Sequence, residues 1–230
     1  PAIAAGNTVV LKPASVTPIT AIILGEICRE AGIPDGVVNV ITGPGASIGE
    51  AMVLSPLVDK VAFTGETSTG RRIMELASGT IKKVTLELGG KSPNIVFPDA
   101  DLDEAVNGSL FAIYTNAGQR CTARTRLFLH RDIHDAFLDK FVDGVKKIRI
   151  GDPLEVSTQM GPVISKKQEQ KVLGYCDAAR EEGAELLAGG RKVSKVDLAS
   201  GNFVEPTVFG GVRSDMSLAQ EEVFGPILAV

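Results

Sequence analysis

The chain has 230 residues, of which 44% are hydrophobic and 23% charged, and its formal net charge is −4. Without a basic surplus or an apolar run of roughly 18 residues, it offers no signal for nucleic acid or a membrane as a partner. Three cysteines and two histidines argue against a disulfide framework and a metal site, so we predict no bound metal and a reducing, cytoplasmic location.

In the first third of the chain, short β-rich runs alternate with helical stretches. We predict strands at residues 8–12, 37–41, 60–63 and 83–87. The predicted helices between them cover residues 17–31, residues 45–54 and a stretch that follows the turn 64–70 and ends near residue 78. Strands and helices that alternate at this spacing predict a parallel α/β sheet with both faces covered.

The pair Gly89-Gly90 interrupts this alternation, and we place a domain boundary between residues 89 and 90. Beyond it we predict strands at residues 94–97, 126–130 and 185–188 and at the end of the chain, near Val230. The predicted helices cover residues 102–114, 133–148 and 168–182, and a further one starts near Cys121. In the helix at 133–148, apolar residues recur at three- and four-residue steps, which is typical of a core-facing helix. The second part is therefore also α/β.

Cys121 lies in the run Asn-Ala-Gly-Gln-Arg-Cys-Thr at residues 116–122. A cysteine shortly after a glycine, and before small and hydroxyl residues, suits a thiol exposed at the start of a helix. There, free backbone N–H groups and the positive end of the helix dipole favour a thiolate and any oxyanion formed beside it. Because an isolated cysteine is more often a buried, unreactive residue, this interpretation depends on the other motifs.

Glu87 lies in the run Leu-Glu-Leu-Gly-Gly-Lys at residues 86–91. Its apolar neighbours and the glycines that follow predict a carboxylate at the end of a buried strand that opens into a cleft. A carboxylate in such a place can act as a general base, whereas the simpler alternative is a solvated surface glutamate. Together, Cys121 and Glu87 indicate covalent thiol catalysis with a carboxylate that activates water.

Two features of the first part favour a nucleotide ligand. Lys12 ends a predicted strand where open parallel sheets bind ligands, so its ammonium could hold a ribose hydroxyl or a phosphate. Gly65 and Gly70 precede a predicted helix, and their lack of side chains lets a pyrophosphate approach the helix N-terminus. We expect Glu66 to point outward, because it would repel a phosphate. Both features also occur at ordinary turns, which is the alternative reading.

Near the end of the chain, the run Glu-Glu-Val-Phe-Gly-Pro at residues 221–226 joins two carboxylates to an aromatic side chain and a turn. Glu222 could hold ribose hydroxyls while Phe224 packs on a flat ring, or the run could be a surface acidic pair before a buried phenylalanine. Arg120, directly before Cys121, could hold an anionic group of a substrate, although arginines also line cleft edges for structural reasons.

In this order, and over the whole of residues 1–230, the motifs resemble the aldehyde dehydrogenase superfamily. The matching runs are Gly-Asn-Thr-Val-Val-Leu-Lys-Pro at 6–13, Phe-Thr-Gly at 63–65 with Gly70, Leu-Glu-Leu-Gly-Gly-Lys-Ser-Pro at 86–93, Gly-Gln-Arg-Cys at 118–121 and Glu-Val-Phe-Gly-Pro at 222–226. Glu87 and Cys121 are 34 positions apart. The resemblance implies an α/β fold with a Rossmann-like, parallel-sheet cofactor-binding portion at 1–89, followed by an α/β catalytic domain at 90–230 that is incomplete at its C-terminus.

The resemblance also implies oxidation of a small-molecule aldehyde to a carboxylic acid with NAD(P). Cys121 would attack the aldehyde, a hydride would pass to the nicotinamide, and Glu87 would activate the water that hydrolyses the resulting thioester. Arg120 would favour a semialdehyde or another anionic aldehyde. The implied cofactor contacts, from the adenosine ribose through the pyrophosphate to the nicotinamide, are Lys12, Ser15, Gly65, Gly70, Leu88, Gly89, Glu222 and Phe224.

Two departures from the family pattern concern the cofactor. Many NAD-preferring members carry a glutamate three residues after the lysine, where it binds the ribose 2′-hydroxyl. This chain has Ser15 at that position, which would not repel a 2′-phosphate, so we favour NADP, or use of both cofactors. Glu66 stands where a serine is common, which weakens the expected pyrophosphate contact there.

A third departure concerns completeness. The family's upstream oxyanion asparagine, the first part of its cofactor domain and its C-terminal oligomerisation arm do not appear in the sequence. We therefore expect a partial chain of a parent protein that forms a homodimer or homotetramer. Losing one oxyanion donor typically costs about 10²–10³ in rate, so we expect this chain alone to be weak or inactive.

Two other functions are open alternatives. The scaffold could serve as a non-catalytic binding or structural protein, although such a protein has no need of Cys121 and Glu87. An unreactive Cys121 would favour that alternative. The same thiol and carboxylate could instead hydrolyse activated esters without a cofactor, and ester turnover that nicotinamide does not affect would favour that one.

Overall fold

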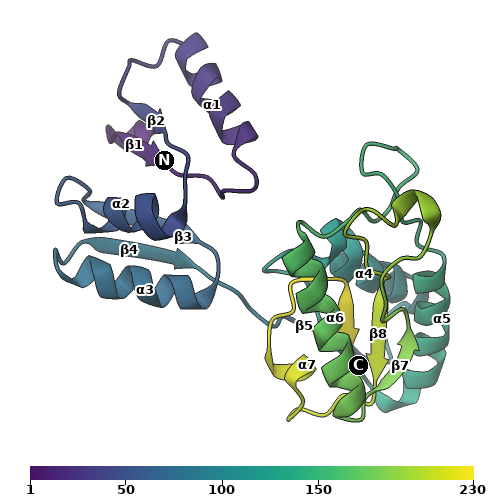
Figure 1. Cartoon of the computed structure of the whole chain (residues 1–230). Helices are drawn as coiled ribbons and strands as arrows, with labels where there is room; N and C mark the ends of the chain where they lie inside the picture. Colours follow the sequence, from purple (N-terminus) through teal and green to yellow (C-terminus); the bar gives the residue numbers. More distant parts are fainter. The chain divides into compact units, whose positions relative to one another are not determined.

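A computed structural model describes residues 1–195 and 197–230. The chain forms two compact units, Pro1–Leu88 and Gly89–Val230 (Figure 1). The predicted domain boundary lies between residues 89 and 90, and the two units meet in the sequence one residue earlier. Among the residues that are described, no helix is long and apolar enough to cross a membrane.

The first unit contains two separate sheets, each made of two parallel strands. β1 pairs with β2, and β3 pairs with β4 over five residue pairs from Lys60↔Lys83 to Thr64↔Glu87. The strands and helices predicted for this part are present, with ends shifted by a few residues. In chain order the elements are η1 (Ile3–Ala5), β1 (Val9–Leu11), α1 (Ile19–Glu30), β2 (Val38–Val40), η2 (Gly45–Gly49), α2 (Glu50–Leu54), β3 (Lys60–Thr64), α3 (Thr67–Ser78) and β4 (Lys83–Glu87).

The prediction that both sheet faces are covered is wrong for the β3–β4 sheet. On one face of the β3–β4 sheet, Phe63 and Leu86 pack with their neighbours against a small core that includes Val53 and Ile73 of α2 and α3. Successive side chains of a strand point to opposite faces, so Glu87 lies on the other face, where the residues are exposed. The predicted burial of the strand at 83–87 is therefore also wrong, because the helices that contact this sheet cover one face.

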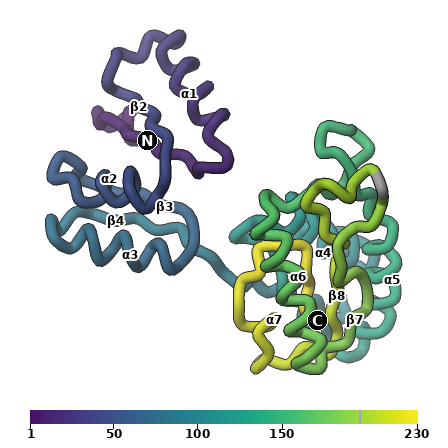
Figure 2. The backbone as a smooth tube through the Cα atoms, in the orientation of Figure 1, coloured from purple at the N-terminus to yellow at the C-terminus, as the bar shows by residue number. Residues whose placement is uncertain are grey.

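The second unit is built on one five-stranded sheet with the strand order β5-β6-β9-β8-β7. All neighbours are parallel except β7 and β8, which are antiparallel. Figure 2 shows the yellow end of the chain returning to the middle of this unit, where β9 lies between β6 and β8. In chain order the elements are β5 (Pro93–Val96), α4 (Leu102–Tyr114), η3 (Thr115–Gly118), β6 (Arg126–Leu129), η4 (Arg131–Ile133), α5 (His134–Lys146), α6 (Lys166–Glu181), β7 (Glu185–Ala188), η5 (Val196–Leu198), β8 (Thr207–Gly210), α7 (Ser217–Gln220) and β9 (Ile227–Ala229).

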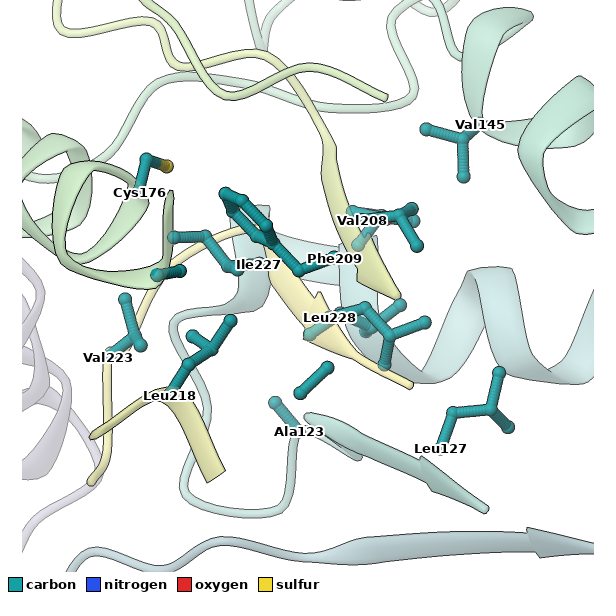
Figure 3. Close-up of a cluster of buried hydrophobic side chains, with 14 of the residues drawn as sticks. Ala123, Leu127, Val145, Cys176, Val208, Phe209, Leu218, Val223, Ile227 and Leu228 are labelled. Carbon is teal, nitrogen blue, oxygen red and sulfur yellow. The ribbon is translucent and has the colours of Figure 1, made fainter. Parts of the chain in front are cut away.

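The second unit has the larger hydrophobic core. Phe137, Phe141 and Val145 of α5 are buried in it, as their spacing predicted. Figure 3 shows how Phe209 of β8 and Leu228 of β9 lie among the other apolar side chains of this core. The central strands and the helices of this unit therefore share one apolar core. This core fixes the ends of the strands, where the candidate site lies.

Candidate active site

The predicted catalytic cysteine lies at one edge of the five-stranded sheet, near two charged residues. Lys91 precedes β5, Cys121 precedes β6 and Glu222 precedes β9. These strands are adjacent and parallel, so their amino ends lie at the same edge. Open parallel sheets usually bind ligands at the carboxyl ends of their strands. In this unit, by contrast, the candidate residues lie on loops that lead into the strands.

Close contacts connect these loops to one another. The N–H of Gly90 donates a hydrogen bond to Oε1 of Glu222 at 3.2 Å, and a Cβ on Gly89 would clash with Oε2 of the same side chain. A Cβ on Gly118 would clash with the carbonyl oxygen of Gly225. Gly118 also has a φ of 69°, which disfavours other residues. The close approach of the loops thus explains why glycine stands at position 89 of the run at 86–93 and at position 118 of the run at 118–121.

The prediction of a helix that starts at Cys121 is wrong. Cys121 lies in a turn after η3, and residues 123–125 belong to no helix or strand before β6 begins at Arg126. Asn116 and Ala117 have φ values of 56° and 52°, which redirect the backbone, and too few residues remain before β6 to form a stable helix. Cys121 therefore does not lie at the start of a helix formed by its own segment. Cys121 is exposed, and a Cβ on Gly90 would lie 3.7 Å from its carbonyl oxygen.

Gln119 holds the loop that carries Cys121. Its Oε1 accepts a hydrogen bond from the N–H of Ile164 at 2.8 Å. Its Nε2 donates to the carbonyl oxygens of Asn116 at 3.2 Å and Pro162 at 3.5 Å. Asn116 Nδ2 in turn donates to the carbonyl oxygen of Gln119 at 3.1 Å. These bonds fix a loop whose positive φ values would otherwise be unfavourable.

The three cysteines differ in how readily they can react. All are free thiols; Cys121 is exposed, Cys28 is half-buried and Cys176 is buried. Burial raises the pKa of the Cys176 thiol to about 11, so this group stays protonated at neutral pH. Cys121 is therefore the thiol that a small molecule can reach most easily.

Lys91 and Arg126 bring two cations to the same edge of the sheet. Lys91 Nζ and Arg126 Nε are shielded from solvent, and neither has a hydrogen-bond partner among the described residues. Burial lowers the pKa of Lys91 to about 8, and the Arg126 guanidinium adds to this lowering, while the carboxylates of Glu222 and Glu221 act in the opposite direction. The sequence motifs predicted no role for Lys91, although it directly follows Gly89 and Gly90.

Replacing Lys91 with methionine is expected to stabilise the protein at pH 7. The pKa of Lys91 is about 8 in the folded chain against an ordinary 10.5, so between these values the unfolded state binds more protons and the wild-type free energy of unfolding rises with pH. Below about pH 8 the whole cost of the buried charge is present, on the order of 3 kcal/mol. Above about pH 10.5 this cost is gone.

Urea unfolding of wild type and Lys91→Met at a series of pH values measures this effect. The stability gain of the variant should be largest at pH 7 and should disappear as the pH approaches 10.5. Lys167→Met is the matched control, because Lys167 is exposed on α6 and its loss should change stability little. A gain for Lys91→Met that does not change with pH would contradict this account of the buried charge.

In the first unit, Lys12 and Ser15 meet at the carbonyl oxygen of Gly43. Lys12 Nζ donates to this oxygen at 3.2 Å and to that of Pro13 at 2.7 Å, and Ser15 Oγ donates to Gly43 at 3.2 Å. Gly43 follows β2, which pairs with β1 in parallel. The two predicted cofactor residues therefore lie together at the carboxyl ends of these strands, where open parallel sheets bind ligands.

The other predicted residues of the first unit gather at the carboxyl ends of β3 and β4. The N–H of Gly65 donates to the carbonyl oxygen of Glu87 at 3.0 Å. Gly70 on α3 is buried, and a Cβ there would come within 2.7 Å of Leu88 Cδ2. The approach of Leu88 to α3 therefore requires glycine at position 70. Glu66 is exposed, and the direction of its carboxylate relative to a bound pyrophosphate stays a prediction.

The structure thus brings some of the predicted residues together within each unit. Arg120 is exposed next to Cys121, and Phe224 is half-buried with a φ of 58°. Gln119 and Gln168, which fasten the loops, were missed, because a polar residue on a loop or helix gives no distinctive signal in a single sequence. Within residues 1–195 and 197–230, no group of three or more His, Cys, Asp or Glu side chains is placed to hold a metal ion.

Comparison with known proteins gives a match over the whole chain. Residues 1–230 match the family model described as the aldehyde dehydrogenase family. The betaine aldehyde dehydrogenase of Bacillus subtilis (strain 168) is 47% identical over 230 residues, which are 100% of this chain and 47% of the relative.

Solved structures give the same result. Betaine aldehyde dehydrogenase from Staphylococcus aureus, in complex with NAD+, has a TM-score of 0.95 and 42% identity over 96% of this chain and 44% of its own. HpcC from Thermus thermophilus has a TM-score of 0.95 and 46% identity over 97% of this chain and 44% of its own. The predicted α/β fold class is confirmed, and the chain spans about half the length of the relatives that it matches.

Proposed function

Because the chain belongs to the aldehyde dehydrogenase family, as its motifs predicted, we propose that the protein oxidises an aldehyde to a carboxylic acid with NAD(P). The observation that carries the proposal is the exposed thiol of Cys121, on a loop that adjoins Gly90 and contacts the segment of Glu222. Thiol chemistry at such a position requires an accessible sulfur on a fixed loop, and the hydrogen bonds of Gln119 provide the fixation.

In the proposed mechanism, the Cys121 thiolate attacks the aldehyde carbon and forms a thiohemiacetal. The nicotinamide cofactor, when bound, supplies the acceptor for the hydride that leaves this carbon, so that a thioester remains on Cys121. The Cys121 N–H is a candidate donor to the oxyanion in both tetrahedral states. Hydrolysis then releases the carboxylic acid and regenerates the thiol.

Glu87 is the proposed general base of the hydrolytic step. Its side chain lies on the exposed face at the carboxyl end of β4, where water can reach it. Taking a proton from water would give the hydroxide equivalent that attacks the thioester carbonyl carbon, and the proton would return to the departing thiolate or to solvent. The backbone of Glu87 is fixed by the hydrogen bond that its carbonyl accepts from Gly65, which restricts where the carboxylate can lie.

The polar groups of the chain suit a dinucleotide. Lys12 and Ser15 share one carbonyl acceptor. The ammonium keeps a further N–H donor and the hydroxyl keeps its acceptor lone pairs, so both can still bind a ribose hydroxyl, and the ammonium can bind a phosphate. Glu222 uses Oε1 for the N–H of Gly90, and its Oε2 can accept from ribose hydroxyls. Phe224 is half-buried and can offer the flat face of its ring to the nicotinamide. Leu88 and Gly89 complete the proposed set with the turn at Gly65 and Gly70.

In this proposal NADP is the favoured cofactor, and the alternative is that the protein uses both NADP and NAD. Ser15 is exposed and uncharged, so it brings no carboxylate that would repel a 2′-phosphate. The Lys12 ammonium shares the acceptor of Ser15 and adds attraction for an anion. Catalytic efficiencies measured with each cofactor test this preference. A clearly higher kcat/KM with NAD than with NADP would contradict it.

Anionic aldehydes, such as semialdehydes, are the proposed substrate class. The Arg120 guanidinium is exposed directly beside the nucleophile, and its fork of N–H donors suits a carboxylate or a phosphate. A cationic aldehyde would be repelled at the same place. The proposed class therefore differs from the betaine aldehyde for which the Bacillus subtilis relative is named.

Arg120→Gln is expected to change the substrate preference in opposite directions for opposite charges. The kcat/KM for succinic semialdehyde should fall about fivefold and that for betaine aldehyde should rise by a similar factor, since an exposed charge contributes about this much. Acetaldehyde should be nearly unaffected. Arg124→Gln removes another exposed guanidinium, three residues after Cys121, and is the control. An unchanged preference in Arg120→Gln would rule out the proposed role.

The formation of reduced nicotinamide by the natural protein tests the function as a whole. The assay combines NADP or NAD with succinic semialdehyde, glyceraldehyde 3-phosphate, betaine aldehyde and acetaldehyde. Aldehyde-dependent reduction would support the proposal, and its absence across the panel would contradict it.

We also propose a homodimeric or homotetrameric state and a cytoplasmic location. The three free cysteines fit a reducing compartment. Light scattering of the purified protein measures the oligomeric state, and a monomer would contradict that part of the proposal.

A further inference from the structure

Two cationic side chains of the second unit are shielded from water and have no hydrogen-bonded partner. Lys91 Nζ and Arg126 Nε are both inaccessible to solvent, and neither donates a hydrogen bond to any of the described residues. In native proteins a buried charge is nearly always paired or hydrogen-bonded, because removing an ion from water is costly. Two such cations in one place therefore indicate a binding partner of opposite charge.

The pairing of β5 with β6 brings these two residues together. Arg126 is the register partner of Pro93, and its N–H donates to the carbonyl oxygen of Ser92 at 3.4 Å. Lys91 directly precedes Ser92. After burial, the Arg126 guanidinium has the largest effect on the pKa of Lys91 and lowers it, as expected of two cations that lie close to each other. The guanidinium lies 5.8 Å from the ring centroid of Phe128, a cation–π contact that restricts its movement.

The carboxylates nearest to Lys91 are held by other donors. Glu222 Oε1 accepts a hydrogen bond from the N–H of Gly90 at 3.2 Å. Glu221 Oε2 accepts one from the Tyr175 hydroxyl at 2.6 Å. Both carboxylates raise the pKa of Lys91 through their charge, but neither is hydrogen-bonded to its ammonium. They therefore weaken the local positive charge without acting as the partner of Lys91.

The charge balance around Lys91 favours one further negative charge. The charged groups that act on it are Arg126 and Lys171, which are cationic, and Glu221 and Glu222, which are anionic. With Lys91 itself, three positive charges face two negative charges. A monoanion would neutralise this excess, whereas a dianion would reverse it. The Nε of Arg126 and one terminal N–H form an edge that matches the two oxygens of a carboxylate.

We propose that Lys91 and Arg126 form a binding site for a small free carboxylate, such as acetate or another short-chain acid. The carboxylate would lie between the ammonium and the guanidinium and would accept hydrogen bonds from Nζ and Nε. Because both atoms are shielded from solvent, entry requires a local opening, which a compact acid needs less than a bulky one. The site does not depend on the proposed function, although that reaction would release a molecule of the same class.

Saturation-transfer NMR on the acetate methyl group, with the natural protein at pH 7, tests the proposal. Sodium acetate replaces sodium chloride at constant ionic strength, so that screening by salt does not change. The signal is expected to saturate with a Kd of about 1 mM, the affinity that two charge-assisted hydrogen bonds supply. Acetamide has a similar shape without the charge and should give no saturable signal.

Variants of the two cations locate the bound acetate. Lys91→Met keeps the length of the side chain and removes the charge, so the Kd is expected to rise by about tenfold or more. Lys167→Met is the matched control, because Lys167 is exposed on α6, and its Kd should stay within about twofold of wild type. Arg126→Lys keeps the charge but lacks the planar pair of donors, and its Kd should rise about fivefold. It is also the deciding variant if the melting curve of Lys91→Met shows that it does not fold.

Raising the pH should weaken acetate binding. The pKa of Lys91 is about 8, so its ammonium loses a proton above this value, whereas acetate and Arg126 stay charged. The Kd at pH 10 is expected to be about tenfold higher than at pH 7, and Lys91→Met should not show this increase. Acetate should also stabilise the wild type at pH 7 by mass action, so the stability advantage expected for Lys91→Met should shrink in acetate.

These measurements separate the site from the proposed function, because neither cofactor nor aldehyde enters them. Saturable acetate binding that Lys91→Met weakens would support the proposal. Wild type without a saturable signal, a Kd that both variants leave unchanged, or tighter binding of sulfate than of acetate would overturn it. If acetate gives no signal and Lys91→Met is less stable than wild type at pH 7, an acidic side chain already fills the site. That result would overturn the proposal of a free acid as the ligand.

Discussion

Replacing Cys121 with alanine is expected to abolish aldehyde oxidation by the natural protein, with kcat/KM lower by roughly 10³-fold or more. The reason is chemical. Without the sulfur no thiohemiacetal forms. The hydrogen on the aldehyde carbon leaves as a hydride only from the tetrahedral oxyanion that thiol attack generates, so hydride transfer to the cofactor also stops. Cofactor binding should persist, because the Cys121 side chain is not part of the proposed cofactor contacts. Formation of reduced nicotinamide and cofactor affinity are the two measurements.

Cys28→Ala is the matched control for this variant. Cys28 is half-buried in α1 and lies in the other compact unit, so its loss should leave turnover within a few-fold of wild type. Mild alkylation provides an independent check. Exposed Cys121 should be modified with loss of activity, whereas buried Cys176, whose pKa burial raises to about 11, should be protected. Retention of more than a tenth of the activity in Cys121→Ala would reject the cysteine as nucleophile.

Replacing Glu87 with glutamine is expected to separate the two halves of the reaction. Attack by Cys121 and hydride loss do not need the carboxylate, so a first burst of reduced nicotinamide close to one per active site should remain. Hydrolysis needs a base, and glutamine is not one, so steady-state turnover should fall by roughly 10²–10⁴-fold. Rapid-mixing measurements of nicotinamide reduction resolve the burst from the slow phase.

Glu26→Gln is the control for the charge change, because Glu26 is an exposed carboxylate on α1 in the same unit. Its time course of nicotinamide reduction should match that of wild type, in the early phase and in the steady-state rate. Loss of the burst in Glu87→Gln would place the carboxylate before hydride transfer and contradict its assignment to hydrolysis. Unchanged turnover would remove Glu87 from the mechanism.

The elements with strong local signals were predictable from the sequence. α4 occupies residues 102–114 as predicted, because Asp101 caps it by accepting bonds from the N–H groups of Asp103 and Glu104 at 3.0 Å. α5 follows the periodicity of Phe137 and Phe141, both fully buried. In such cases the residues that decide the element are neighbours in the sequence.

Elements that depend on distant partners were not predictable. β8 was missed, although Pro206 and the glycines at 210 and 211 bound a short apolar run. Four residues become a strand there because β7 and β9 pair with them on both sides. The helix expected at Cys121 fails for a similar reason, since the need to enter β6 beside β5 and β9 outweighs the local preference.

The candidate site divides in the same way. The motifs identified residues whose chemistry is distinctive, such as Cys121 and Glu222. They could not reveal that Gly118 packs against Gly225, or that Gln168 holds the carbonyls of Val223 and Phe224, because these contacts join residues more than 50 positions apart. Long-range contacts of backbone atoms leave little trace in the residue types of one sequence.

The central claim is a covalent acyl intermediate on Cys121, and mass spectrometry of the acid-quenched protein tests it most directly. During turnover of an aldehyde with NADP or NAD, and most abundantly in Glu87→Gln, the intact mass should increase by the mass of the acyl group less the thiol hydrogen that it replaces. The added mass should lie on the peptide that contains Cys121 and should be absent without cofactor. Reduced nicotinamide formed with no adduct in Glu87→Gln, or an adduct on another residue, would contradict the claim.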